Sequence, residues 1–441
     1  MKKYLPLLLL TYFVIACNTK PDYKKITSNP ELYAHVVHAL NEVVMGNNFS
    51  PIVASRNYAY ATIAGYEVTA AGNPSKYQSL VGQLKGFTNV PAPIDTSKID
   101  FPFASILAFC KVGESVTFPK GSLETYTDSL KKLVLANGMS SKMLEASEAY
   151  AQAMSEAIIA WSKKDNYAQT RTAERYTVKS IPGRWVPTPP LYAQAAEPHW
   201  ASIRTMTLDS ASQFRPSPPP PFNITDKNSE YYINLMKIKN AVDSLTTEQK
   251  HIAIFWDDNP FKINVKGHVM MSTKKFSPPG HWMSIVGIAN KTAKANFETV
   301  TYAYAKTAIA LFDSFIHCWD AKYTYNTMRP ETAINKYIDP NWRPLLQTPA
   351  FPEYTCGHST ISSAAAEALT SIYGDNFAYT DSTEIEFGIA NRNFTSFRQA
   401  AIENNWARFY GGLHYHNSCI TSTSQGKLVG DWVVSHLKMI K

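Results

Sequence analysis

The chain has 441 residues, of which 45% are apolar and 18% are charged, a composition typical of a globular protein with a substantial core. Its length allows two domains, or one large helical domain with insertions. The formal net charge of +8 comes from 43 Lys and Arg residues against 35 Asp and Glu residues, and the basic side chains are scattered along the chain. The charge therefore weakly favours small anionic partners, and binding to nucleic acid is not expected.

The N-terminus has the pattern of an export signal. Two lysines precede an apolar run over residues 5–16, which is too short to span a bilayer. The run ends in Val-Ile-Ala directly before Cys17 and resembles the lipobox of bacterial lipoproteins, in which this cysteine is acylated. We predict a signal peptide over 1–16, a lipidated Cys17 and a polar tether over 17–30, with an ordinary secretory signal as the alternative. The first prediction places the protein in the bacterial cell envelope, at the outer membrane or in the periplasm, where it contacts the membrane only through its lipid.

Helical periodicity dominates the rest of the chain, and alternating strand patterns are nearly absent. Residues 164–228 are irregular and rich in proline, which favours an extended surface excursion. We therefore predict an all-α fold of packed bundles, with an N-terminal helical region over 31–228 and a second helical region over 229–441. Helices are expected to begin at Glu31 and to cover residues 56–72, 122–135, 140–163, 228–257, 291–325, 358–374, 385–411 and 425–440.

Four cysteines remain when Cys17 is set aside. They contain no CxxC pair and no short-spaced framework, so the sequence allows three disulfide pairings and does not choose among them. The four are Cys110, Cys318, Cys356 and Cys419.

The first of three segments suited to binding an anion runs from Lys322 to Pro330. Lys322 and Arg329 are seven positions apart, so one continuous helix would place them on the same face, two turns apart. Pro330 is expected to end that helix directly after Arg329. A lysine point charge and a planar guanidinium aimed at one spot suit an anion with several oxygens. Read alone, such a pair is more typical of a solvated helix face.

The second segment runs from Phe351 to Ser359 and precedes an alanine-rich helix. Gly357 allows a backbone N–H to approach a ligand close to the positive end of that helix. His358 lies at the same end, where it can act as a general acid or base. Read alone, a helix-capping histidine is an equal alternative.

The third segment runs from Arg408 to His414 and begins in the last turn of the helix predicted over 385–411. Arg408 supplies a second guanidinium near the end of that helix. A pair of glycines then turns the chain, so that His414 can reach the same anion. Read alone, this segment is equally consistent with a structural role and with a functional one.

Together, the three segments resemble the signature of vanadium-dependent haloperoxidases and type-2 phosphatidic acid phosphatases. In that superfamily Lys-x6-Arg-Pro, Pro-Ser-Gly-His and Ser-Arg-x3-Gly-x-His bind vanadate or phosphate. The resemblance implies the helical-bundle fold of vanadium chloroperoxidases and acid phosphatases. It also implies that Lys322, Arg329 and Arg408 are the cationic groups that bind the anion.

The same resemblance assigns roles to the remaining residues of the signature. It implies that Gly357 donates its backbone N–H to the anion and that His358 is the acid–base histidine. It implies that His414 bonds to vanadium or attacks phosphorus. Trp319 and Phe351 fall where fungal-type chloroperoxidases keep a Trp and a Phe beside the halide.

The resemblance extends, more weakly, into other parts of the chain. Residues 49–60, 255–258 and 278–282 look like elements of secreted bacterial members of the superfamily. An acidic residue here, Asp257 or Asp258, is expected to orient one of the arginines.

Two positions depart from the signature in ways that bear on chemistry. Cys356 replaces the serine before Gly-His, and a thiol is a weaker hydrogen-bond donor than a hydroxyl. Losing one such bond costs about 1.5–3 kcal/mol of anion affinity, and a thiol beside a peroxide-activating metal is open to oxidation. Ser418 replaces an aspartate that orients the last histidine, a role that His416 or a carboxylate from elsewhere can take over. The change to Ala407 before the second arginine is milder.

Three functions are consistent with this signature. A haloperoxidase would hold vanadate as its cofactor and act on peroxide and halide. An acid phosphatase would need no cofactor and would cleave phosphate monoesters through a phosphohistidine at His414. An oxyanion-binding lipoprotein would keep the pocket without turnover. Trp319 and Phe351 favour the haloperoxidase branch, whereas Cys356 and Ser418 count against an optimised enzyme of either kind.

Overall fold

The structure is a computed structural model that describes residues 22–266 and 269–441. The predicted signal peptide and Cys17 lie outside the described residues. Within them the chain forms fifteen α-helices, three short 3₁₀ turns and two antiparallel two-stranded sheets, which confirms the predicted all-α fold. Among the described residues, no helix combines the length and the apolar character needed to cross a bilayer.

The N-terminal part of the fold is a set of packed helices followed by a long irregular stretch. Its helices are α1 (Tyr23–Thr27), α2 (Pro30–Gly46), α3 (Pro51–Gly72), α4 (Phe101–Val116), α5 (Glu124–Ala136), α6 (Ser141–Ser162) and α7 (Tyr167–Thr172), with a 3₁₀ turn at Thr96–Lys98 and another at Trp200–Ser202. The segment expected to be a tether through residue 30 therefore contains α1. Its Thr27 hydroxyl donates to Asp100 at the start of α4, over 3.3 Å.

The C-terminal part carries the three segments of the signature. Its helices are α8 (Glu230–Asp243), α9 (Thr247–Phe255), α10 (Pro278–Thr292), α11 (Phe297–Tyr325), α12 (Pro330–Tyr337), α13 (Gly357–Tyr373), α14 (Phe397–Tyr410) and α15 (His416–His436). Strands β1 (Lys262–Lys266) and β2 (Val269–Thr273) pair with each other, as do β3 (Tyr379–Asp381) and β4 (Arg392–Phe394), with a 3₁₀ turn at Ile385–Phe387 between the latter two.

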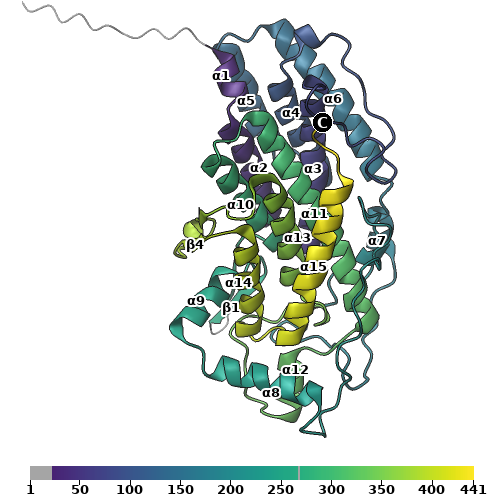
Figure 1. The fold of residues 1–441 in the computed structure, drawn as a ribbon, viewed down its shortest axis with the longest axis vertical. Coiled ribbons are helices and arrows are strands. Elements are labelled where there is room, and N and C mark those ends of the chain that lie inside the picture. Colours follow the sequence, from purple (N-terminus) through teal and green to yellow (C-terminus); the bar gives the residue numbers. More distant parts are fainter. Residues whose placement is uncertain (1–21, 267–268) are drawn as a thin grey trace, which may run out of the picture.

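The core runs through both halves of the chain. Helices α3 and α11 are buried along almost their whole length, because small and apolar residues surround each axis on every side. They pack on each other, and α13 packs on α11 and α15, so these helices lie side by side along the long axis of the molecule (Figure 1). One main cluster of buried apolar side chains spans them, and the boundary predicted near residue 228 does not interrupt it.

Helix boundaries follow local signals, and they correct three predictions. The helix predicted over 228–257 is two helices, α8 and α9, because Thr246 caps the start of α9. Ser50 accepts from the N–H of Val53 and is followed by proline, so α3 begins before the predicted residue 56. The helix predicted over 385–411 is wrong in its first half. That half forms a 3₁₀ turn and strand β4, and α14 begins only after Ser396 caps it. Phe387 and Phe394, which lie at helical spacing, belong to this turn and strand.

A candidate oxyanion site at the ends of three helices

Lys322 and Arg329 do not share one helix, contrary to the sequence-based prediction. Helix α11 ends at Tyr325, and Asn326 follows in the left-handed region with a φ of 49°, its N–H bonded to the Lys322 carbonyl. Arg329 has extended backbone because it precedes a proline, and Pro330 begins α12 instead of ending α11. The turn brings the two cations together from different directions.

Lys322 is fully buried and holds the loop that follows residue 350. Its ammonium donates to the carbonyls of Pro352 (2.9 Å), Glu353 (3.1 Å) and Thr355. Burial lowers the pKa of Lys322 to about 8, and the positive charge of Arg329 acts in the same direction. The lysine therefore contributes charge and also fixes the backbone from which the second segment of the signature starts.

Arg329 bridges the second and third segments. Its Nε donates to the carbonyl of Phe351 (2.8 Å), and its Nη1 donates to the carbonyl of Leu413 (3.0 Å) and lies 3.0 Å from His414 Nε2. The other terminal nitrogen, Nη2, is buried and has no partner. Burial lowers the pKa of Arg329 to about 10, so the guanidinium is charged at neutral pH.

The contacts of His414 fix its tautomer. A guanidinium can only donate, so His414 Nε2 accepts from Arg329 and carries no proton in the neutral ring. The proton is on Nδ1, which donates to Glu353 Oε1 over 3.0 Å. Nε2 therefore carries the lone pair that a bond to a metal or to phosphorus needs, and in this structure that lone pair accepts from Arg329.

Glu353 supplies the carboxylate that the signature places four residues after His414. It also accepts from the backbone N–H of Tyr415 (3.2 Å) and from the hydroxyl of Ser418 (3.1 Å). The replacement of aspartate by Ser418 therefore leaves His414 with a carboxylate from another segment. His416 does not take this role, because its ring packs against Trp406 and its Nδ1 lies 3.1 Å from a lysine ammonium. Sequence reasoning missed Glu353, although it is the only acidic residue between 351 and 359.

The first turn of α13 presents the second segment. His358 is half-buried, but its Nε2 is buried and unpartnered, and desolvation together with Arg408 lowers its pKa well below the ordinary value. Its ring is therefore neutral at pH 7. A Cβ built on Gly357 would lie 3.6 Å from Trp319, an ordinary contact, so packing alone does not require glycine here. This is consistent with a close approach of a ligand to the Gly357 backbone.

Cys356 precedes this turn and is fully buried. Its N–H donates to Ser422 Oγ over 2.8 Å, which ties the loop to α15. Burial acts to raise the pKa of the thiol, but hydrogen bonding with Cys419 and the nearby ring of His414 outweigh it, and the pKa falls below the ordinary value. All four cysteines of the described residues are free and buried.

Arg408 reaches the site from the last turn of α14. Its Nη1 donates to the carbonyls of Trp256 (2.9 Å) and Asp257 (3.4 Å), and its Nε is buried without a partner. A carboxylate of Asp257 or Asp258 was expected to orient an arginine. Backbone carbonyls of the same segment bind Arg408 instead. The Asp257 side chain instead pairs with Lys262 at 3.3 Å, and that of Asp258 pairs with His281 at 2.8 Å.

A cavity of about 510 Å³ opens onto this group. Phe351, His358 and Arg408 line it, together with the segments 188–191 and 257–261. The Phe351 ring lies 5.0 Å from the ring of Trp319 and 4.9 Å from the Lys322 ammonium. The two aromatic residues predicted for the halide position therefore lie together beside the cations.

Three of the predicted residues have a buried nitrogen atom without a partner in the protein, namely Arg329 Nη2, Arg408 Nε and His358 Nε2, and the two guanidinium nitrogens can only donate. An unpaired buried donor costs about 1–3 kcal/mol, more if charged. A tetrahedral oxyanion carries the acceptors that would satisfy them. Vanadate and phosphate therefore both fit the donor set.

Comparison with known proteins gives the family. Residues 302–441 match the family model described as the VCPO second helical-bundle domain. No match was found among curated proteins. The crystal structure described as the first bacterial vanadium-dependent iodoperoxidase is 41% identical, with a TM-score of 0.88, covering 93% of this chain and 97% of its own.

The chain belongs to the vanadium-dependent haloperoxidase family.

More distant haloperoxidases share the fold. The apo form of a bacterial vanadium-dependent chloroperoxidase is 15% identical with a TM-score of 0.62, covering 88% of this chain and 94% of its own. The holo form of a bacterial vanadium-dependent chloroperoxidase is also 15% identical, with a TM-score of 0.59, covering 95% and 96%. At 15% identity, these two matches show a shared helical fold.

Proposed function

We propose that this haloperoxidase binds vanadate and uses it to oxidise iodide with hydrogen peroxide. The observation that carries the proposal is the pair of unpartnered buried donors on Arg329 and Arg408, with the unpartnered His358 Nε2 and His414 Nε2 beside them. The 41% identical relative is described as an iodoperoxidase, which supports iodide as the halide.

Each residue of the site has a distinct part in holding vanadate. His414 would bond to the metal through Nε2, with Glu353 keeping the proton on Nδ1. Arg329, Arg408 and the Gly357 N–H would donate to the vanadate oxygens, and Lys322 would balance their charge. When bound, vanadate supplies a Lewis-acidic centre that activates hydrogen peroxide toward attack by halide.

His358 is suited to take the proton that hydrogen peroxide loses on binding. Burial and Arg408 keep its pKa well below the ordinary value, so its ring is neutral before peroxide enters. Its Nε2 has no protein partner and can accept a proton from hydrogen peroxide. The cavity that His358 lines provides the path from solvent.

Trp319 and Phe351 are the proposed halide contacts. Their rings lie together, and the positive groups of Lys322 and Arg329 lie 4.9 Å from the centre of the Phe351 ring. A large, weakly hydrated anion such as iodide gives up less hydration free energy than a smaller halide when it moves from water to a site beside apolar rings. The positive charges behind the ring favour an anion at the same place.

The test is triiodide formation by the protein loaded with orthovanadate and supplied with peroxide and iodide, with bromide and chloride run in parallel. Arg408→Met should reduce vanadate affinity at least tenfold, because a lost hydrogen bond to a charged group costs about 1.5–3 kcal/mol. Arg398→Met is the matched control on the same helix, since Arg398 pairs with Glu367 and Asp375 away from the site. It should leave vanadate affinity unchanged.

The competing functions give different results in the same preparation. Hydrolysis of p-nitrophenyl phosphate without halide oxidation would favour the phosphatase. Vanadate binding without either turnover would favour the binding protein. An Arg398 variant as impaired as the Arg408 variant would contradict the proposed site.

A further inference from the structure

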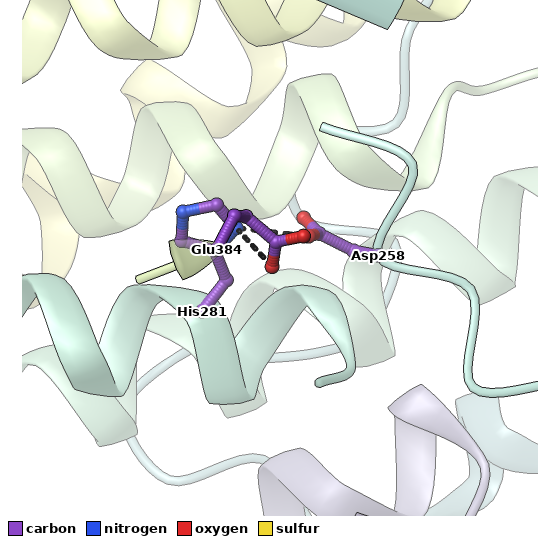
Figure 2. A group of neighbouring side chains, drawn as sticks. All are labelled: Asp258, His281 and Glu384. Atoms are coloured by element: carbon purple, nitrogen blue, oxygen red, sulfur yellow. Dashed lines mark hydrogen bonds and ion pairs between the residues drawn. The ribbon is translucent and has the colours of Figure 1, made fainter. Parts of the chain in front are cut away.

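A buried cluster of charged side chains lies behind the segment that holds Arg408. Figure 2 shows its centre, where the carboxylates of Asp258 and Glu384 approach the ring of His281 on α10. The ring nitrogens lie 2.8 Å from Asp258 Oδ1 and 3.0 Å from Asp381 Oδ2. Glu384 Oε1 is 3.9 Å from His281 Nδ1, and Lys275 pairs with the other oxygen of Glu384 at 2.8 Å.

The geometry assigns a positive charge to His281. A neutral imidazole has one N–H, whereas here both nitrogens face carboxylate oxygens that can only accept. Both contacts are satisfied when the ring is protonated twice. Burial opposes that charge, but Asp258 and Asp381 outweigh it and raise the pKa of His281 well above its ordinary value.

The same side chains are close enough together to hold a metal ion, whose binding would require His281 to lose one of its two protons. The ligand atoms of Asp258, His281 and Glu384 lie within 4.8 Å of one another. A doubly protonated ring has no lone pair for a metal, and Lys275 already neutralises Glu384. In this structure the cluster is a network of ion pairs, in which Asp258 Oδ2 and Glu384 Oε1 have no hydrogen-bond partner.

The network is joined to the oxyanion site through three consecutive residues. Trp256 and Asp257 offer the carbonyls to which Arg408 Nη1 donates, and Asp258 follows directly. Asp258 has a φ of 43°, in the left-handed region that few residues other than glycine, Asn and Asp adopt. His281 holds it by the 2.8 Å ion pair and also stacks on Trp256, with ring centres 4.7 Å apart.

We propose that His281 is a positioning residue for Arg408. By pairing with Asp258 and stacking on Trp256, it fixes the two carbonyls that aim the Arg408 guanidinium at the oxyanion. The inference rests on the proposed function only in requiring that the site binds vanadate. It concerns affinity for the anion and does not depend on which halide is oxidised.

The test is a double-mutant cycle on vanadate affinity, measured by isothermal titration calorimetry with orthovanadate. His281→Gln should weaken binding about 10- to 100-fold, the usual effect of removing a partner behind a directly binding group. The double variant with Arg408→Met should bind no more weakly than Arg408→Met alone, because His281 acts only through Arg408. An effect of His281 on the site that does not pass through Arg408 would give additive losses.

Two further variants keep the test decisive. His317→Gln removes another buried histidine, whose Nδ1 donates to the Ala211 carbonyl and which has no part in the cluster around His281. This variant should leave vanadate affinity unchanged. If His281→Gln fails to fold, Asp258→Asn removes one charge of the same pair at constant shape and should weaken vanadate binding in the same way.

The possible results separate this inference from the proposed function. Wild-type protein that binds no vanadate would overturn both. Wild-type binding with unchanged affinity in His281→Gln or Asp258→Asn, additive losses in the cycle, or a bound divalent metal that copurifies and is lost in His281→Gln, would overturn the role of His281 alone.

Discussion

Glu353→Gln isolates the charge that orients His414. In the wild type, His414 Nδ1 lies 3.0 Å from Glu353 Oε1. The substitution keeps the size of the side chain and leaves an amide oxygen that can accept from His414 Nδ1. A hydrogen bond to a charged partner is worth about 1.5–3 kcal/mol and a neutral one about 0.5–1.5 kcal/mol. The difference, about 1–1.5 kcal/mol, predicts a loss of about tenfold in vanadate affinity.

The assay is calorimetric titration with orthovanadate, accompanied by the rate of triiodide formation. Ser418→Ala is the matched control, because it removes a 3.1 Å hydrogen bond from a neutral hydroxyl to the same carboxylate and leaves the charge in place. It should weaken vanadate binding less than Glu353→Gln. Equal affinities for Glu353→Gln and the wild type would refute the assignment of Glu353 as the partner of His414.

A charge-relocation variant sharpens the same prediction. Ser418→Asp alone places a second carboxylate against Glu353 and should weaken vanadate binding by repulsion. Combined with Glu353→Gln, it returns one carboxylate to the group around His414 and should recover most of the affinity. A double variant weaker than either single variant would contradict this reasoning.

Three further predictions concern other parts of the molecule. Cys356→Ser should strengthen vanadate binding by up to about 1.5–3 kcal/mol, since a hydroxyl is a better donor than a thiol; unchanged or weaker affinity in titration would mean that residue 356 does not face the anion. His358→Ala should lower the turnover rate about 10²- to 10⁴-fold with little change in vanadate affinity, because its part is proton transfer; steady-state kinetics that show only a higher KM for peroxide would contradict this. Burial raises the pKa of Glu67 from its usual 4.5 to about 7, so the wild type binds an extra proton when folded and loses about 3 kcal/mol of stability as pH rises through that window. Glu67→Gln should not lose it, and urea unfolding of both proteins from pH 4.5 to 8 would show parallel curves if the prediction is wrong.

Sequence periodicity predicted the helical class because most helices bury one apolar face or are apolar all round. It failed over 385–395, where Phe387 and Phe394 have helical spacing but belong to a 3₁₀ turn and to β4. Helix α10 was not predicted, although a serine cap and two prolines mark its start. Local pattern does not reveal which short apolar stretch is buried by neighbours distant in the chain.

The signature predicted the identity of the site residues better than their local geometry. Lys322 and Arg329 converge through a left-handed turn at Asn326, not along one helix face. Glu353 and His281 were missed because their roles depend on contacts across 61 and 23 positions of sequence, to His414 and Asp258 respectively. Such partners appear only when the fold brings the segments together.

The most direct measurement of the central claim is a crystal structure of the protein grown with orthovanadate. We predict vanadium at bonding distance from His414 Nε2, with its oxygens accepting from the nitrogens of Arg329 and Arg408 that have no protein partner. Vanadium bound at another surface, or density at this position with His414 turned away from it, would contradict the account.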